Sequence, residues 1–125
     1  MLRSASVIAL LALTACSTPP AAPSPINRQL TLAPGESSQV ADGLSLRFVG
    51  VPAESRCPGD AFCVTAGDAT VRIEVNAVEG ELHTATPQAV QLAGVTISLV
   101  SLDPYPFNTR PIQQGDYRAT VRVRR

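Results

Sequence analysis

The chain has 125 residues, of which ten are basic and ten acidic, so its formal net charge at pH 7 is zero. All ten basic residues are arginines. This balance argues against nucleic acid and against an electrostatically bound lipid surface as the main partner, because both attract chains with excess positive charge.

The N-terminus has the pattern of an export signal. Arg3 supplies a positive charge, and residues 7–13 form an apolar run that is too short to span a bilayer, which needs about 20 residues. The run leads into Leu13-Thr14-Ala15-Cys16, which resembles the lipobox of bacterial lipoproteins. The resemblance implies that residues 1–15 are a lipoprotein signal peptide and that Cys16 is lipidated with several acyl chains, palmitate among them, which anchor a protein stably.

Ser17, and not an aspartate, follows this cysteine. By analogy with enteric bacteria, a serine here predicts the outer membrane, with the protein facing the periplasm. The alternative is an ordinary secretory signal that is cut nearby and leaves Cys16 as a free thiol.

Residues 16–25 form a proline-rich tether behind the lipidated cysteine. Four of the ten residues are proline, and the segment has no apolar periodicity. In polyproline geometry its last nine residues reach about 28 Å, so the domain can stand off the membrane surface.

Residues 26–125 alternate apolar and polar side chains in several runs, which is the pattern of strands with one buried face. The longest runs are at 43–51, 70–78, 94–102 and 117–124, and the shorter ones are at 28–32, 38–41, 81–85 and 88–92. Turn dipeptides separate them: Pro34-Gly35, Asp42-Gly43, Glu79-Gly80 and Ala93-Gly94.

No stretch of this region has a sustained helical period. Successive short strands without helices between them favour an all-β fold, an antiparallel β-sandwich of the immunoglobulin-like or jelly-roll-like kind, with a small β-barrel as the alternative. The length fits a single domain.

Cys57 and Cys63 lie six positions apart, with Pro58 and Gly59 between them. An exported chain meets oxidising conditions, which predicts a disulfide that closes a small ring and contributes about 2–2.5 kcal/mol. A zinc site needs three or four ligands, and beyond these two cysteines His83 is the main further candidate. A redox pair is more often C-x-x-C before a helix. A stapled loop is therefore the favoured interpretation, and no metal or cofactor is expected.

The same segment carries a resemblance. Residues 54–58 (ESRCP), Cys63 and the Ala66-Gly67 pair are similar to the motif (D/E)SRCP-x4-C-x-x-AG of small uncharacterised bacterial envelope lipoproteins. The segments at 102–106 (LDPYP) and 116–119 (DYRA) also resemble segments of that group. Where this chain has Thr65, the group often has an aromatic residue. The resemblance implies a secreted or lipid-anchored β-sandwich, and it implies no activity.

Arg56 stands among several carboxylates in sequence. Glu54, Asp60 and Asp68 are within loop reach of its guanidinium, which can bridge two chain segments bidentately. We expect Arg56, Asp60 and Asp68 to brace the loop, with ligand contact as the alternative. Gly67 is expected to adopt a turn conformation that other residues avoid.

The segment 103–107 (DPYPF) is the second candidate contact region. Its two prolines predict a rigid segment that does not pair with a strand and that presents Tyr105 and Phe107. Alternatively, these aromatic residues plug the end of the core.

The last strand has Arg118, Arg122 and Arg124 on its polar face. This stripe fits either a docking surface for an acidic partner or a solvated face that discourages aggregation, paired with Glu74 across the sheet. We favour the solvated face.

The side chains needed for catalysis are sparse. Any Ser-His-Asp arrangement has to use His83, and no nucleophile elbow, phosphate loop or dinucleotide fingerprint is present in the sequence. We therefore expect a non-catalytic interaction module on the envelope membrane, with a protein partner and no nucleic acid. Phe62, Tyr105 and Phe107 are its expected contacts. The rivals are an inhibitor that presents the Cys57–Cys63 loop to an envelope hydrolase, an enzyme using His83 with a carboxylate, and a purely structural envelope role.

Overall fold

The computed structural model describes residues 13–22 and 24–125, so most of the predicted signal peptide lies outside the described residues. The described part folds into eight strands and one short 3-10 helix, η1 (Gln114–Asp116). The strands are β1 (Asn27–Leu32), β2 (Ser37–Ala41), β3 (Leu44–Glu54), β4 (Ala69–Val75), β5 (Val78–His83), β6 (Val90–Leu92), β7 (Val95–Asp103) and β8 (Arg118–Arg124).

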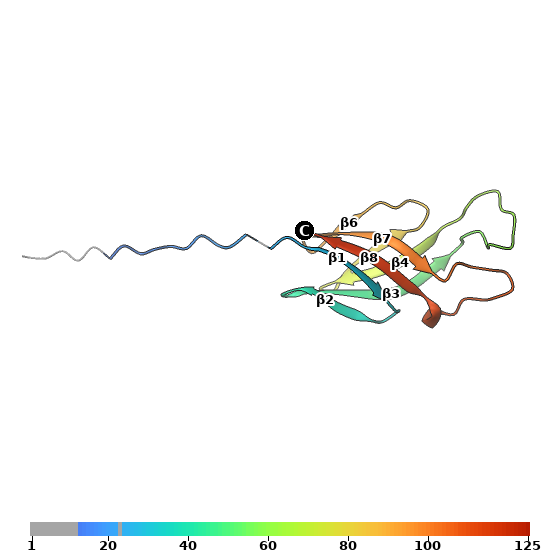
Figure 1. Cartoon of the computed structure of the whole chain (residues 1–125), viewed down its shortest axis with the longest axis horizontal. Coiled ribbons are helices and arrows are strands. Elements are labelled where there is room, and N and C mark those ends of the chain that lie inside the picture. Colours follow the sequence, from blue (N-terminus) through green and yellow to red (C-terminus); the bar gives the residue numbers. More distant parts are fainter. Residues whose placement is uncertain (1–12, 23) are drawn as a thin grey trace, which may run out of the picture.

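The strands form two four-stranded antiparallel sheets, with the orders β1-β8-β7-β6 and β2-β3-β4-β5. The two sheets pack against each other and, over residues 26–125, do not close into a barrel (Figure 1). The predicted all-β sandwich is therefore confirmed. Consecutive strands from β2 to β5 and from β6 to β8 are neighbours, which is a simpler connectivity than the Greek keys of immunoglobulin-like and jelly-roll domains.

The core lies between the sheets and is made by the alternation seen in the sequence. Along β4 and β8 every second residue is buried, because successive side chains of a strand point to opposite faces. Phe48 is the largest fully buried side chain and lies at the centre of β3. Each Val, Leu, Ile or Phe of this kind contributes about 1.5–3 kcal/mol relative to an exposed side chain.

One predicted strand and one predicted turn are wrong. The run 70–78 does not continue to Val78, because Asn76 and Ala77 adopt positive φ angles of 49° and 66° and reverse the chain between β4 and β5. Asn tolerates this conformation, and its side chain bonds to the Ser45 amide (3.0 Å) and the Gly43 carbonyl (2.9 Å) of the neighbouring hairpin. The Glu79-Gly80 pair lies inside β5 instead.

The pairing expected for Glu74 is also wrong. Glu74 lies on β4, in the sheet opposite to the arginines of β8, and its carboxylate is 3.6 Å from Arg47 of β3. Glu74 therefore does not neutralise the arginines of β8.

The tether and the C-terminus leave from the same end of the sandwich (Figure 1). The backbones of Ile26 and Arg125 exchange two hydrogen bonds (3.0 and 3.2 Å), and the Arg125 guanidinium donates to the Ser24 carbonyl. The two longest loops lie at the opposite end. Among the described residues, no helix has the length and hydrophobicity needed to cross a membrane.

Candidate functional site

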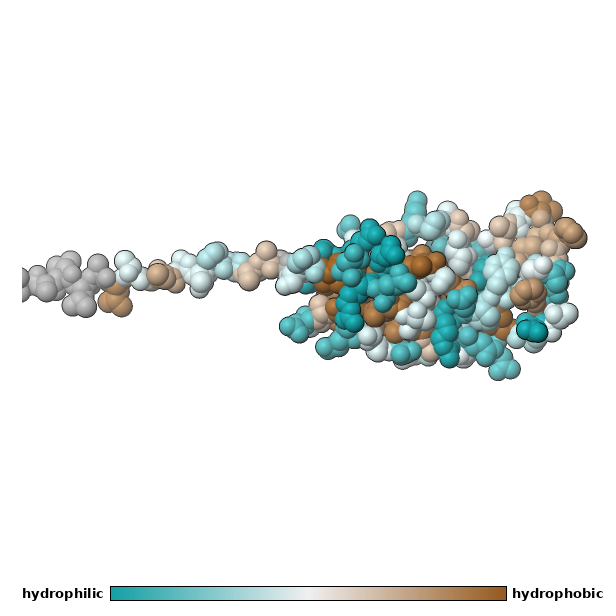
Figure 2. Space-filling view, in the orientation of Figure 1, coloured by the Kyte–Doolittle hydropathy of each residue, from teal (hydrophilic) through white to brown (hydrophobic). Residues whose placement is uncertain are grey.

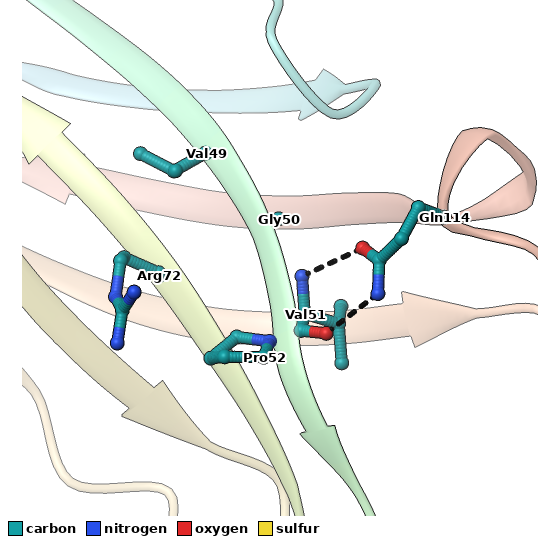
Figure 3. A pocket seen from close by; sticks show the side chains of 6 residues that line it. All are labelled: Val49, Gly50, Val51, Pro52, Arg72 and Gln114. Atoms are coloured by element: carbon teal, nitrogen blue, oxygen red, sulfur yellow. Dashed lines mark hydrogen bonds between the residues drawn. The ribbon is translucent and has the colours of Figure 1, made fainter.

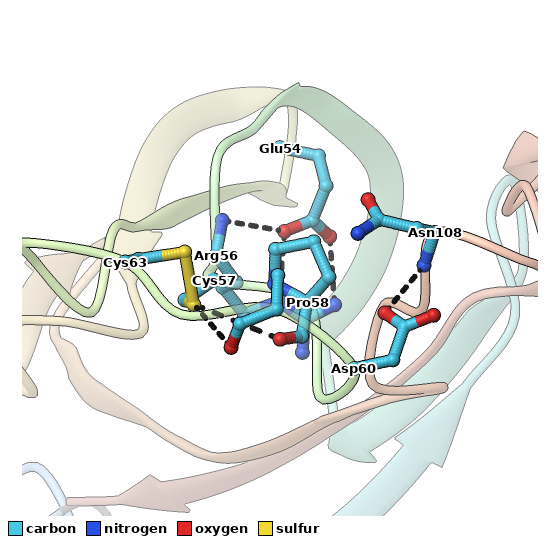
Figure 4. Close-up of a disulfide and its surroundings, with 8 residues drawn as sticks. Glu54, Arg56, Cys57, Pro58, Asp60, Cys63 and Asn108 are labelled. Carbon is cyan, nitrogen blue, oxygen red and sulfur yellow. Dashed lines mark hydrogen bonds and ion pairs between the residues drawn. A yellow bond between two sulfur atoms is a disulfide. The ribbon is translucent and has the colours of Figure 1, made fainter.

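Two loops meet at the end of the sandwich that lies farthest from the tether, and we call this region (residues 55–68 and 104–117) the loop end. The amide of Gly59 donates to the Pro106 carbonyl (2.9 Å), and the amide of Asn108 donates to the Asp60 carboxylate (2.8 Å). The second contact is visible in Figure 4. The sequence left open whether the two candidate contact regions share one end, and the structure brings them together.

The predicted disulfide between Cys57 and Cys63 is present (Figure 4). The Cys57 amide also donates to the Ala66 carbonyl (2.8 Å), so the base of the ring is tied to the returning chain. Beyond this base, the side chains of Phe62 and Val64 are fully exposed. The ring therefore presents one apolar side chain, Phe62, to water, and Val64 presents a second one directly after the ring.

Arg56 lies behind this ring and is 7% exposed. Its Nε and Nη2 donate to the two carboxylate oxygens of Glu54 (2.8 and 2.7 Å), which is a bidentate pair. Its Nη1 donates to the Leu102 carbonyl (2.8 Å), Nη2 also donates to the Pro104 carbonyl (3.0 Å), and the guanidinium lies 5.3 Å from the centre of the Tyr105 ring. With these partners Arg56 braces one loop against the other.

Tyr117 completes this network. Its hydroxyl donates to Glu54 Oε2 (3.0 Å). Burial by itself raises the pKa of Glu54, but the hydrogen bonds and positive charge of Arg56, with the Tyr117 hydroxyl, outweigh burial and hold that pKa below its ordinary value. Burial, together with the hydrogen bond to the negative Glu54, raises the pKa of Tyr117 to about 12.

Of the three carboxylates within loop reach of Arg56, only Glu54 pairs with it, whereas Asp60 and Asp68 brace the loop through other partners. Asp60 accepts the Asn108 amide, and Asp68 Oδ2 lies 2.6 Å from Nδ1 of His83. The reason is backbone direction: Asp60 lies on the outer turn of the ring, whereas Asp68 lies on the returning chain, directly before the start of β4.

The Asp68–His83 contact ties the end of β5 to the start of β4. Asp68 Oδ1 also accepts the Ala85 amide (3.0 Å) and the Thr84 hydroxyl (3.2 Å). Desolvation opposes ionisation of Asp68, but these hydrogen bonds and the neighbouring imidazole prevail and lower its pKa. His83 thus has the carboxylate that the rival enzyme hypothesis requires, beside a cavity of about 220 Å³ that Arg56 also lines. The described residues contain no group of three or more His, Cys, Asp or Glu side chains suited to a metal ion.

Gly67 has a φ of +69°, and any Cβ at this position would overlap the carbonyl oxygen of Ser55. The chain after the ring returns in close contact with the chain before it. The Ser55 hydroxyl donates to the Asp68 carbonyl and accepts from the Asp68 amide. Glycine is therefore needed here for both its conformation and its missing side chain.

Tyr105 and Phe107 are about half exposed, at 48% and 45%. Phe107 packs over Gly59, where a Cβ would come within 2.7 Å of its Cε1 atom. Two cavities of about 350 and 320 Å³ share Phe107, Arg110, Pro111 and Ile112 as walls, and Tyr105 lines the larger one. The segment thus both covers the loop end and presents aromatic surface.

A smaller hollow of about 170 Å³ lies next to the irregular part of β3, where the pairing with β4 shifts around Gly50. Gln114 closes one side of it by pairing with the backbone of Val51, which donates to Oε1 (3.2 Å) and accepts from Nε2 (2.7 Å) (Figure 3). This clamp holds η1 against β3 and so positions the second loop.

Sequence reasoning missed Tyr117, Gln114 and the exposure of Val64. The alternation of the run 117–124 places Tyr117 on the apolar face of the last strand, and nothing in the sequence directs its hydroxyl to Glu54. Val64 directly follows Cys63 and belongs to no alternating run. An apolar residue in such a position is the sequence signal that could have indicated its exposure.

No family model matches this chain, and no curated protein or solved structure is found to be similar to it.

Proposed function

We propose that this chain is a lipid-anchored protein of the bacterial envelope that acts as a non-catalytic interaction module and binds another envelope protein through its loop end. The observation that carries this proposal is the placement of the exposed apolar side chains. Phe62 and Val64 project from the end of the domain opposite to the tether, and Figure 2 shows hydrophobic surface gathered there.

The construction of the loop end supports a recognition role. Its ring is closed by a disulfide and braced by the buried Arg56, so little conformational freedom remains to be lost on binding. Aromatic side chains at the centre of an interface supply much of its binding energy. Phe62, Tyr105 and Phe107 offer such side chains on two loops that contact each other.

The anchor is proposed from the lipobox and from the shape of the chain. Residues 13–22 have no regular secondary structure, and Cys16 is exposed and lies outside the Cys57–Cys63 disulfide. A tether at one end and recognition loops at the other orient the loops away from the membrane. Replacing Cys16 with Ser should abolish incorporation of a palmitate analogue and release the protein from the membrane fraction. Persistent labelling or membrane association of the Cys16→Ser protein contradicts the anchor.

The partner site is tested by photo-crosslinking in intact cells of the source bacterium. A photoreactive residue replaces Phe62 in the full chain, and the control replaces Val78, which is also apolar and exposed (48%) but lies outside the loop end, at the start of β5. A discrete protein adduct from position 62 alone supports the proposal and gives the partner by mass spectrometry. Equal adducts from both positions, or none, contradict a dedicated site at the ring.

The same ring supports a second candidate function, inhibition of an envelope hydrolase. Many enzyme inhibitors present a preorganised loop whose backbone moves little on binding. The full chain would be titrated into assays of envelope proteases and cell-wall hydrolases, with Phe62→Ser as the control. The absence of inhibition in every class contradicts this candidate and leaves the partner-binding proposal intact.

A further inference from the structure

The outer surface of the sheet β1-β8-β7-β6 has a polar centre that is rich in arginine. Arg122 and Arg124 on β8 point outward, because Val121 and Val123 between and beside them are buried. Six neighbouring residues in the strand register carry amide or hydroxyl groups: Asn27, Gln29, Thr31, Thr96, Ser98 and Thr120. We call these eight residues the arginine face.

The positive charge of this face is not neutralised from within the protein. Among residues 13–22 and 24–125, no carboxylate lies within 4.0 Å of Arg122 or Arg124. Arg122 donates instead to the neutral amide of Gln29 (3.1 Å). Strongly hydrophilic side chains gather over this part of β8 in Figure 2.

The opposite sheet gives the comparison. Its two outward arginines are both paired: Arg47 with Glu74 at 3.6 Å and Arg72 with Glu81 at 3.0 Å. The two sheets share one chain and one solvent, so the unpaired arginines are a property of one face and not of the whole surface.

Two structural explanations for the arginines do not hold. Charged residues commonly protect edge strands from pairing with other chains. However, β8 is an inner strand, with β1 on one side and β7 on the other. The second explanation is that Glu74 neutralises the arginines from a neighbouring strand. It fails because Glu74 is on β4, in the opposite sheet.

We propose that the arginine face binds a linear polysaccharide that carries carboxylate groups. Guanidinium groups bind carboxylates bidentately, and the surrounding hydroxyl and amide groups are donors and acceptors suited to sugar hydroxyls. Arg122 and Arg124 are two residues apart on one strand, about 7 Å, so they can contact successive groups of a polymer. Arg124 lies opposite Asn27, the first residue of β1, so the face begins beside the tether and extends along the open side of the sheet, where a chain-like ligand can cross several strands (Figure 1).

The test measures binding of the full chain to immobilised polygalacturonate, with dextran as the neutral control. Each lost charge-assisted contact should weaken binding by about tenfold, so the variant Arg122→Gln/Arg124→Gln should bind at least about tenfold more weakly than the wild type. The matched control Arg47→Gln/Arg72→Gln changes the net charge by the same amount on the opposite sheet and should bind as the wild type does. Thermal unfolding of both variants checks that they are folded.

Wild-type binding should also weaken as NaCl is raised, because the contacts are exposed to screening. No binding to polygalacturonate, or equal loss in both double variants, overturns the proposal. A third variant, Thr120→Val, separates a glycan from a general anion. It should weaken binding to polygalacturonate and leave binding to inorganic polyphosphate unchanged, and equal effects on both polymers overturn the assignment to a polysaccharide.

Discussion

The hydroxyl of Tyr117 and the carboxylate of Glu54, 3.0 Å apart, connect the two sheets at the loop end. Glu54 is the last residue of β3 in one sheet, and Tyr117 directly precedes β8 in the other. Because Glu54 also holds the buried Arg56, this hydrogen bond joins sandwich, ring and second loop in one network. The stability of the protein should depend on the protonation of both residues.

At acid pH the protein should lose stability through Glu54. Its pKa in the folded state lies below the ordinary value of 4.5, so the unfolded chain binds the proton first as the pH falls. The contribution is fully present above pH 4.5 and is lost as the pH falls through the folded-state pKa. Urea unfolding from pH 6 to pH 3 should show a steeper loss for the wild type than for Glu54→Gln. Parallel curves for the two proteins would contradict this role.

At alkaline pH the relevant group is Tyr117. Its pKa is raised from 10.0 to about 12, so the folded state keeps a proton that the unfolded chain releases. The stability contribution is present below pH 10 and is lost as the pH rises from 10 to about 12. In Tyr117→Phe, the unfolding free energy should be lower at pH 8 and should fall less between pH 10 and pH 11.5. The prediction fails if Tyr117→Phe keeps the wild-type alkaline slope.

Replacing Arg56 should destabilise the domain more than replacing any other arginine. Arg56→Ala removes the positive charge that pairs with Glu54 and the guanidinium donors to the carbonyls of Leu102 and Pro104, and we expect a loss of about 2–4 kcal/mol in the free energy of unfolding. Arg72→Ala is the matched control, because its ion pair with Glu81 is exposed and should cost less than about 1 kcal/mol. Chemical denaturation of both variants measures the difference, and similar losses would show that Arg56 is not the brace.

Gly67→Ala should disrupt the return of the chain from the ring. Alanine at φ +69° costs about 1–2 kcal/mol, and its Cβ would also overlap the Ser55 carbonyl. Gly43→Ala isolates the second effect, because Gly43 has a similar φ of +70° while no described atom lies within 4 Å of its Cβ position. Gly67→Ala should therefore be the less stable variant, and equal unfolding midpoints would mean that the backbone shifts at no cost.

Removing the disulfide should weaken the domain without unfolding it. The seven-residue ring predicts a loss of about 2 kcal/mol in Cys57→Ala/Cys63→Ala, chiefly because the unfolded chain gains freedom. The variant should also be cut faster by chymotrypsin beside the exposed Phe62. A reducing agent should change the wild type and leave the variant unaffected, and wild-type stability that is insensitive to reduction would contradict the expected contribution.

Several features were accessible from the sequence because they depend on local chemistry. Alternating residues identified β3, β7 and β8, since the period of two belongs to any strand with one buried face. The spacing of Cys57 and Cys63 was enough to predict a ring. The turn at Asn76 and Ala77 was not recognised, because a single asparagine in an alternating run reads as a continued strand until its backbone angles are known.

Tertiary structure alone decided which of these features act together. The carboxylates of Glu54, Asp60 and Asp68 are all within loop reach of Arg56 in the sequence, but backbone direction lets only Glu54 pair with it. The two loops meet because both connections leave the sandwich at the end opposite to the tether, which depends on how the chain passes between the sheets. The last strand, β8, is an inner strand because β1 pairs with it. This pairing between the two ends of the domain surrounds Arg122 and Arg124 with the polar side chains of β1. Composition and periodicity determine what each segment can form, whereas long-range pairing determines which side chains meet.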